Sequence, residues 1–251
     1  MNRILFNADE LDADGLATFG GVRAEHVLTV LHGEVGQALK TGVVDGLIGT
    51  GVIERIEGEM VTVKCVHDRE APSPWIDLVL APPRPRVMKR LLPQLAAMGV
   101  GRIVLVGAAK VEKAFWGAQL LKEEIYRPLL VDGLMQAGTT ALPTIQIERA
   151  FGRWLEGGRF EEQFGSQTDR IVAHPECGAR RAANVCEPPR FASRPVLAIG
   201  PEGGWTDDEV VRLEAHGFRR MSLGPRILRT DTATIALLAQ LMPLYDSLWM
   251  P

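Results

Sequence analysis

Two short segments near the C-terminus carry the residue types best suited to binding a small molecule. The first is Leu197-Ala-Ile-Gly-Pro-Glu-Gly-Gly-Trp205, and the second is Ser222-Leu-Gly-Pro-Arg-Ile-Leu-Arg-Thr-Asp-Thr-Ala233. Each runs from an apolar stretch into a turn of glycine and proline and then into a predicted helix. Such turns leave backbone N–H and C=O groups open to a ligand, because glycine and proline place little bulk beside them. Two loops of this kind, close together in the sequence, predict adjacent walls of one pocket.

The second loop is the more informative of the two. Gly200-Pro-Glu-Gly-Gly204 has neither the G-x-G-x-x-G spacing nor a following Gly-Lys-Ser/Thr, so a tight turn before a capped helix explains it when it is taken alone. Thr206 and Glu209 predict that cap, a box in which each side chain binds the other residue's backbone N–H. The second loop carries two arginines and then Thr230 and Asp231 at a predicted helix start. Helix capping explains one of those residues but not the whole set. The set therefore indicates a role in binding or catalysis.

The composition excludes several classes of protein. The 46% of apolar and 24% of charged residues among 251 are typical of an ordinary globular protein, and the net charge of −3 shows no basic excess that would by itself indicate nucleic-acid binding. Cys65, Cys177 and Cys186 lack the paired spacing of a zinc site, which predicts reduced thiols and no metal. No stretch is apolar enough for a membrane span or a signal peptide. We therefore expect a cytoplasmic protein.

Two regions with different patterns divide the chain. Residues 1–70 are rich in glycine, and apolar and polar residues alternate on both sides of Glu57-Gly58-Glu59, which predicts a β-hairpin. This region is predicted to be a small β-barrel-like domain with one short helix near Arg23–Leu31. Ala71-Pro-Ser-Pro74 breaks regular structure and is the predicted linker. Residues 75–251 form the second predicted domain.

The second domain alternates between apolar strands and helices, which predicts an α/β fold with a parallel sheet and helices on both faces. One helix ends at Gly99, and another covers 115–137 with a break before Pro128. The helix that follows Thr206 stops at Gly217, and the last helix runs through Leu241 and is apolar enough to be buried. The predicted strands are 76–81, 102–107, 144–147, 170–173, 195–199 and 219–223.

The amino-acid sequences of the two loops resemble the signature of the RsmE family, the 16S ribosomal RNA uridine-N3 methyltransferases of the SPOUT superfamily. Leu197–Gly204 and Leu223–Thr232 match that signature in order and spacing. Glu25–Leu31, followed by Gly36-Gln37, matches the family's N-terminal layout, and His174-Pro175 after a strand is a further likeness. The resemblance implies a SPOUT domain with a trefoil-knotted parallel sheet, preceded by a PUA-like RNA-binding β-domain.

The resemblance also implies a cofactor, partners and site residues. The cofactor is S-adenosyl-L-methionine, and the partners are 16S ribosomal RNA or the small ribosomal subunit and a second copy of the chain. The implied catalytic group is Arg229, Thr230 and Asp231, facing the methyl group and the target base. The implied cofactor contacts are His174, Pro175, Ile199, Gly200, Pro201, Glu202, Gly203, Leu223, Gly224, Arg226, Ile227 and Leu228.

The residue types suit this chemistry. Methylation of uracil N3 requires loss of the N3 proton, and a guanidinium such as that of Arg229 can stabilise the resulting anion, while Asp231 can assist proton removal. N3 lies on the Watson–Crick edge, so the target base must be unpaired or flipped out. A basic cluster at the start of the first helix of the second domain is a hypothesis for RNA contact, with a solvated helix face as the alternative. Its members are Arg84, Arg86, Lys89 and Arg90.

The chain departs from the family pattern at several positions. The family's first helix in this domain carries Gln-Lys and then Glu-Leu-Gly-Val, whereas Gln94 and Ala97 stand here in place of the lysine and the acid. A later helix, which ends Glu-Gln-x-x-Arg in the family, reads Met135-Gln-Ala-Gly-Thr139. The N-terminal arginine becomes His32, and the glutamate after Arg-Thr becomes Asp231. The cofactor loops are intact, while groups expected near the RNA differ.

Two alternatives therefore stand beside the uridine-N3 enzyme. The chain could keep the fold and the cofactor pocket but act as an RNA-binding or ribosome-assembly factor with little catalysis. It could also methylate another RNA nucleotide, at a base or at a ribose 2′-oxygen. Intact loops with Arg229 and the Thr-Asp-Thr turn favour an enzyme, and the identity of the modified nucleoside distinguishes the alternatives.

Overall fold

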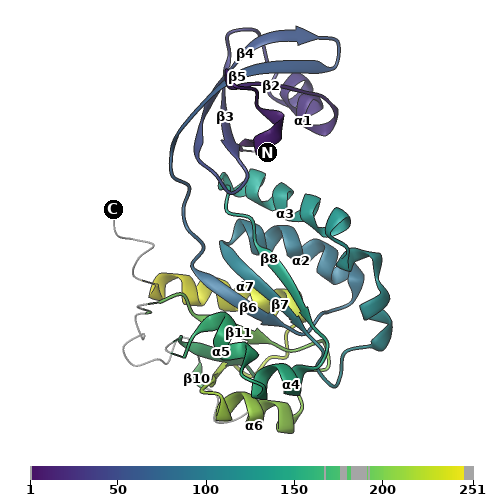
Figure 1. Ribbon diagram of the computed structural model, residues 1–251. Coiled ribbons are helices and arrows are strands. Elements are labelled where there is room, and N and C mark those ends of the chain that lie inside the picture. Colours follow the sequence, from purple (N-terminus) through teal and green to yellow (C-terminus); the bar gives the residue numbers. More distant parts are fainter. Residues whose placement is uncertain (1, 167, 176–179, 182–190, 192, 246–251) are drawn as a thin grey trace. The chain divides into compact units, whose positions relative to one another are not determined.

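The computed structural model describes residues 2–166, 168–175, 180–181, 191 and 193–245 (Figure 1). The chain divides into two compact units. The first unit is Met1–Ser73 together with Pro128–Leu142, and the second is Pro74–Arg127 together with Pro143–Pro251. The functional division into an RNA-binding domain and a methyltransferase domain stays a prediction. No helix in the described part of the chain is both long and apolar enough to cross a membrane.

The first unit contains a curled, half-barrel sheet of five strands in the order β1-β3-β4-β5-β2. The predicted hairpin is confirmed, because β4 and β5 are antiparallel and turn at Gly58, whose φ is +60°. Ile53, Val61 and Val63 are fully buried in the core of this sheet. The predicted short helix is present as α1 (Gly21–Glu25) continued by a π-helix (His26–Val30). The strands are β1 (Ile4–Phe6), β2 (Leu16–Phe19), β3 (Ala38–Val43), β4 (Ile48–Glu57) and β5 (Met60–Arg69).

Arg3 joins the segment 128–142 to this sheet. Its guanidinium is largely buried and donates from Nε to the carbonyl oxygen of Gly138 at 2.9 Å and from Nη1 to that of Thr41 at 2.7 Å. The backbone N–H of Arg3 also donates to the carbonyl oxygen of Met135 at 3.0 Å. A charged donor with several carbonyl partners can be buried at little net cost, because its hydrogen-bonding groups are satisfied.

The helix predicted over 115–137 begins later and is not broken. The structure has 3₁₀ turns at Lys113–Gly117 and Gln119–Leu121, and then α3 (Glu123–Ala137) with Pro128 inside it. A proline here removes one hydrogen bond to the carbonyl group four residues earlier, on Glu124. Glu124 and Pro128 are both exposed, so water can satisfy that carbonyl oxygen. The buried Leu130 and Leu134 stabilise the continuation of the helix.

The second unit is built on a seven-stranded sheet in the order β10-β12-β9-β11-β6-β7-β8, in which every pair is parallel. All six predicted strands are present. The two-residue strand β10 was not predicted, because two residues are too few to show a periodic pattern. The trefoil knot implied by the resemblance stays a prediction. The strands are β6 (Ile76–Leu80), β7 (Val100–Val106), β8 (Thr144–Glu148), β9 (Arg170–Ala173), β10 (Arg180–Arg181), β11 (Val196–Ile199) and β12 (Arg219–Ser222).

Helices cover both faces of this sheet, as predicted. On one face, strand residues such as Val79, Val104 and Val172 share a core with Trp154 and Leu213 from the helices. Strand residues alternate between faces, and on the other face α2 contacts both β7 and α7. The helices of the first face are α4 (Phe151–Glu156), α5 (Arg159–Phe164) and α6 (Asp207–Ala215), and those of the second are α2 (Pro85–Ala97) and α7 (Thr230–Leu241).

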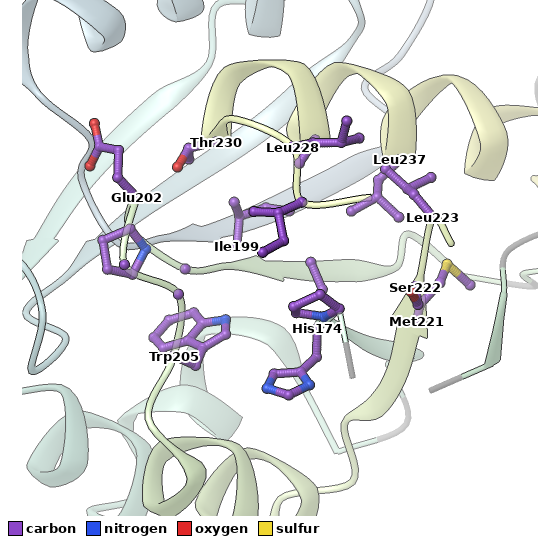
Figure 2. Close-up of a pocket in the computed structure, with 18 of the residues that line it drawn as sticks. His174, Ile199, Glu202, Trp205, Met221, Ser222, Leu223, Leu228, Thr230 and Leu237 are labelled. Carbon is purple, nitrogen blue, oxygen red and sulfur yellow. The ribbon is translucent and has the colours of Figure 1, made fainter. Parts of the chain in front are cut away.

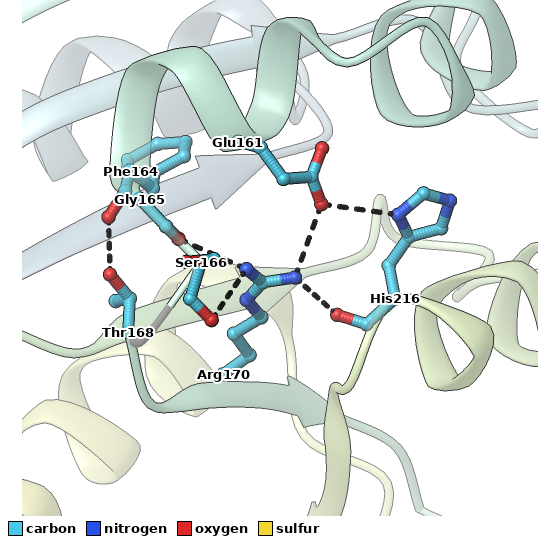
Figure 3. A network of polar contacts seen from close by, with 7 residues as sticks. All are labelled: Glu161, Phe164, Gly165, Ser166, Thr168, Arg170 and His216. Carbon is cyan, nitrogen blue, oxygen red and sulfur yellow. Dashed lines mark hydrogen bonds and ion pairs between the residues drawn. The ribbon is translucent and has the colours of Figure 1, made fainter.

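Arg170 ties together the elements at the start of β9 (Figure 3). Its side chain is largely buried and forms an ion pair with Glu161 at 3.3 Å. The guanidinium also donates to the carbonyl oxygens of His216 at 2.6 Å and Gly165 at 3.0 Å. It lies over the ring of Phe160, 4.6 Å from the centroid. The planar guanidinium of Arg170 therefore donates to acceptors from α5, from the end of α6 and from the turn before β9.

We expect Arg170→Lys to lower the free energy of unfolding by about 2 kcal/mol. A lysine ammonium is a compact charge that cannot reach all of these acceptors at once, so partly buried carbonyl groups lose their charged donor. Urea unfolding followed by circular dichroism measures the change. Arg212→Lys is the matched control, since Arg212 is only partly buried and its two partners, Asp208 at 2.9 Å and Glu156 at 3.3 Å, are exposed carboxylates. Exposed pairs contribute less than about 1 kcal/mol, and equal effects of the two variants would contradict the prediction.

Candidate active site

One cavity of about 380 Å³ lies in the second unit at the carboxyl ends of β9, β11 and β12 (Figure 2). These three strands are neighbours in the sheet order β12-β9-β11. The carboxyl ends of neighbouring parallel strands are where open α/β sheets bind their ligands. The two loops therefore do form walls of one pocket, as their sequences predict. Every predicted cofactor residue lines it: His174, Pro175, Ile199, Gly200, Pro201, Glu202, Gly203, Leu223, Gly224, Arg226, Ile227 and Leu228.

The first loop, 200–205, is held by contacts from other elements. A side chain at Gly200 would place its Cβ 2.9 Å from the backbone nitrogen of Trp205, so only glycine fits there. Lys110, in the loop after β7, donates from Nζ to the carbonyl oxygen of Gly203 at 2.9 Å. Glu202 accepts from the backbone N–H of Arg84, at the start of α2, at 2.9 Å. These contacts fix the loop before any ligand binds.

Glu209 fixes the end of the same loop. The predicted capping box is confirmed, with the Thr206 hydroxyl accepting from the Glu209 N–H at 3.3 Å and Glu209 Oε2 accepting from the Thr206 N–H at 2.8 Å. Glu209 is also buried, and its Oε1 accepts from the backbone N–H of Ala109 at 2.7 Å. This carboxylate therefore joins the loop after β7 to the loop after β11, which is a structural role.

The second loop, 223–229, is more open. Its turn is set by Ser222, whose hydroxyl accepts from the backbone N–H of Gly224 at 3.2 Å, and by the φ of +116° at Gly224, which an L side chain rarely adopts. Arg226 is exposed, and Ile227 is 89% exposed. In contrast, Leu237 of α7 is buried where it lines the cavity. The pocket thus has an apolar interior and an open, charged mouth.

The three predicted catalytic residues lie at the start of α7 in different environments. Thr230 is buried and lines the cavity. Arg229 is the N-cap residue of α7, is exposed and has no side-chain hydrogen bond or ion pair within the described part of the chain. Asp231 accepts from Nη2 of Arg90 at 3.1 Å, and its side chain is 20% exposed. Arg229 and Asp231 therefore flank the pocket without lining it.

The predicted basic cluster is exposed at the start of α2. Arg90 is engaged with Asp231, and Arg84 lies 3.8 Å from the carboxylate of Glu112. Arg86 and Lys89 have no ion pair with any residue that the structure describes. The cluster therefore splits into two paired arginines and two cations that remain available to a phosphate.

Several lining residues were missed from the sequence. Lys110 lies in the loop after β7, and the rule that ligands bind at the carboxyl ends of parallel strands could have found it. Trp205 borders the first loop in the sequence, a position that favours a place over the pocket, although packing is the more common role of a tryptophan. The remaining missed residues carry no sequence signal of ligand binding, because the pattern around Asp207 indicates the start of a helix and that around the others indicates packing. The missed lining residues are Lys110, Gly204, Trp205, Asp207, Met221, Ser222, Ala173, Ala233 and Leu237.

The described residues hold no group of three or more His, Cys, Asp or Glu side chains that could bind a metal ion. Cys65 is a free thiol inside the first unit, and burial raises the pKa of this thiol. Cys177 and Cys186 lie outside the described residues.

A parallel sheet with a pocket at the carboxyl ends of neighbouring strands defines an α/β protein that binds a small organic ligand there. Residues 69–242 match the family described as the RNA methyltransferase domain. This match covers more than half of the chain, so the chain belongs to the RNA methyltransferase domain family. The resemblance found in the two loops is thereby confirmed.

Relatives and solved structures agree with this assignment. The chain is 29% identical, over 94% of its length and 88% of the relative's, to ribosomal RNA small subunit methyltransferase E of Treponema pallidum. It superposes on a Legionella pneumophila structure solved with the bound cofactor SAM, with 25% identity, a TM-score of 0.74, and 96% and 97% of the two chains covered. The Neisseria gonorrhoeae ribosomal RNA small subunit methyltransferase E shares the fold, with 20% identity, a TM-score of 0.76 and 98% of each chain covered.

Proposed function

We propose that this protein is an S-adenosyl-L-methionine-dependent methyltransferase that modifies N3 of a uridine in 16S ribosomal RNA. The observation that carries the proposal is the single pocket in which both signature loops meet, lined by every residue predicted to bind the cofactor. The relatives named for methylation of small-subunit ribosomal RNA support the substrate class. The assignment of a uridine, and of its N3 position, rests on the amino-acid sequences of the two loops.

The pocket fits the proposed cofactor. A volume of about 380 Å³ falls in the range of pockets that enclose drug-sized ligands. Ile199 and Leu237 offer an apolar interior for a flat base, and glycines in both loops open backbone groups to polar atoms. Bound there, the cofactor would supply an electrophilic methyl group on a sulfonium. The Legionella pneumophila protein with bound SAM supports this assignment.

The residues at the start of α7 are placed to serve the target base. Arg229, which has no ion pair among the described residues, flanks the pocket, where it can stabilise the uracil anion left when the N3 proton departs. Asp231 is the predicted proton acceptor, and its pairing with Arg90 at 3.1 Å fixes the direction of the carboxylate. Thr230 contributes to the pocket wall beside them. Holding both reactants in line supplies much of the acceleration in such a transfer.

The proposal includes a homodimer. Ile227 is 89% exposed and the adjoining Leu228 is 38% exposed, both on the loop that borders the pocket. Large apolar side chains grouped at a functional loop favour burial against another protein surface. A second copy of the chain covering this loop would complete the pocket. The proposal also includes the predicted cytoplasmic location, where an enzyme of ribosomal RNA would meet its substrate.

Nucleoside analysis tests the proposed function directly. Purified protein with S-adenosyl-L-methionine is incubated with small ribosomal subunits and, separately, with free 16S ribosomal RNA, each from cells that lack the gene. Digestion and mass spectrometry are expected to reveal N3-methyluridine in one of these substrates. A 2′-O-methyl nucleoside would instead indicate ribose methylation. No new nucleoside on either substrate would favour an RNA-binding or assembly factor.

We expect Arg86→Glu combined with Lys89→Glu to weaken binding to 16S ribosomal RNA and to flatten its salt dependence. If both cations contact phosphates, the slope of log K against log salt concentration falls in magnitude by about 1.4, since each single-strand contact contributes about 0.7. Filter binding over a salt series measures the slope. Arg153→Glu combined with Arg219→Glu is the control, because both arginines are exposed on other elements. An unchanged slope would exclude this helix from the RNA contact.

A further inference from the structure

The indole N–H of Trp205 is a buried donor for which the described residues supply no acceptor. Trp205 is 4% exposed, and its Nε1 atom has no hydrogen-bond partner among the described residues. The ring itself is firmly placed, because it stacks on Phe151 with centroids 5.4 Å apart and an interplanar angle of 30°. A buried donor without a partner costs about 1–3 kcal/mol, so nearly all such groups in folded proteins are satisfied.

This donor faces the cavity. Trp205 lines the pocket, and Figure 2 shows the nitrogen edge of the indole turned toward the space bounded by Ile199 and His174. Two other tryptophans in the same unit show the ordinary situation, since Trp154 Nε1 donates to Gln163 Oε1 at 3.0 Å and Trp75 Nε1 donates to the carbonyl oxygen of Met98 at 2.6 Å. The missing acceptor of Trp205 is therefore expected in whatever fills the pocket.

The position of Trp205 indicates which part of the proposed cofactor binds beside it. Trp205, Ile199 and Leu237 all line the pocket and are almost fully buried, whereas Arg226, which also lines it, is exposed. Burying a charged group is far more costly than burying a neutral one that is hydrogen-bonded. The amino-acid end of S-adenosyl-L-methionine is charged and suits the mouth. The adenosine end is neutral, apolar on its faces and equipped with ring-nitrogen and hydroxyl acceptors.

We infer that the Trp205 indole N–H donates a hydrogen bond to the adenosine part of the cofactor and so selects for a nucleoside acceptor in the pocket interior. This inference rests on the proposed use of S-adenosyl-L-methionine. A phenylalanine at this position would keep an aromatic ring but could not supply the donor. Trp205 is thus a binding residue by its nitrogen as well as by its ring.

Nuclear magnetic resonance of the indole N–H groups tests the hydrogen bond without measuring activity. Protein labelled with ¹⁵N-tryptophan is titrated with S-adenosylhomocysteine, and the Trp205 signal is assigned by its loss in Trp205→Phe. We expect its proton to move downfield and to exchange more slowly with water, while the signals of Trp154 and Trp75 stay in place. The nucleoside 5′-methylthioadenosine is expected to produce the same change, and L-methionine is not.

Calorimetry on the same samples separates the possible outcomes. Trp205→Phe is expected to bind S-adenosylhomocysteine about fivefold more weakly, the loss typical of one neutral hydrogen bond. If the ligand binds with an unchanged Trp205 signal, the inferred hydrogen bond is wrong while the proposed function stands. A shift with S-adenosylhomocysteine but not with 5′-methylthioadenosine would overturn the adenosine assignment. If the wild-type protein binds neither compound, the proposed function fails together with this inference.

Discussion

Arg229→Ala is expected to lower the rate of methyl transfer by about 10²- to 10³-fold and to leave the affinity for S-adenosylhomocysteine unchanged. Arg229 is an exposed N-cap residue whose guanidinium makes no hydrogen bond or ion pair within the described part of the chain, so its removal leaves no described group without a partner. The expected loss arises because the charge acts on the anion that develops at uracil N3, which is absent from the ground state of the cofactor complex.

Single-turnover kinetics with saturating RNA and cofactor measures this effect, and calorimetry measures the affinity. Arg226→Ala is the matched control, since Arg226 is an equally exposed arginine of the same loop that lines the pocket. We expect that variant to weaken cofactor binding with a much smaller effect on the rate at saturation. A rate for folded Arg229→Ala within threefold of the wild-type rate would contradict the catalytic assignment.

The parts of the fold that were predictable are those encoded locally. Apolar runs bounded by glycine and proline predicted the six longer strands of the second unit, and Thr206 with Glu209 predicted the start of α6. The two loops were predicted to share one pocket because two glycine- and proline-containing turns follow apolar stretches close together in the sequence. Each of these inferences depends on residues near one another in the sequence.

Contacts between distant segments were not predictable in this way. Nothing near Arg3 indicates that its guanidinium bonds to the carbonyl oxygen of Gly138, and nothing near Pro128 indicates that burial of Leu130 sustains the helix. The ion pair between Arg90 and Asp231, which joins α2 to α7, likewise connects residues far apart in the sequence.

Glu209 shows how a residue whose sequence pattern indicates only a helix cap can also maintain the pocket. Its carboxylate accepts from the N–H groups of Ala109 and Thr206 at 2.7 Å and 2.8 Å. Lys110 and Trp205, the neighbours of those two residues, both line the cavity. The position of the pocket wall therefore depends on one buried carboxylate that does not itself line the cavity.

We expect Glu209→Ala to lower the free energy of unfolding by about 2 kcal/mol, because it removes half of a capping box and leaves two partly buried N–H groups without an acceptor. Affinity for S-adenosylhomocysteine is expected to fall by about tenfold, equivalent to about 1.4 kcal/mol, as the two loops lose their common anchor. Urea unfolding and calorimetry measure the two effects. Asp208→Ala is the control, since Asp208 is an exposed acid of the same turn paired with Arg212, and should change stability by less than about 1 kcal/mol. Wild-type affinity in a destabilised Glu209→Ala would show that the cap supports the helix alone and that the loops hold the pocket without it.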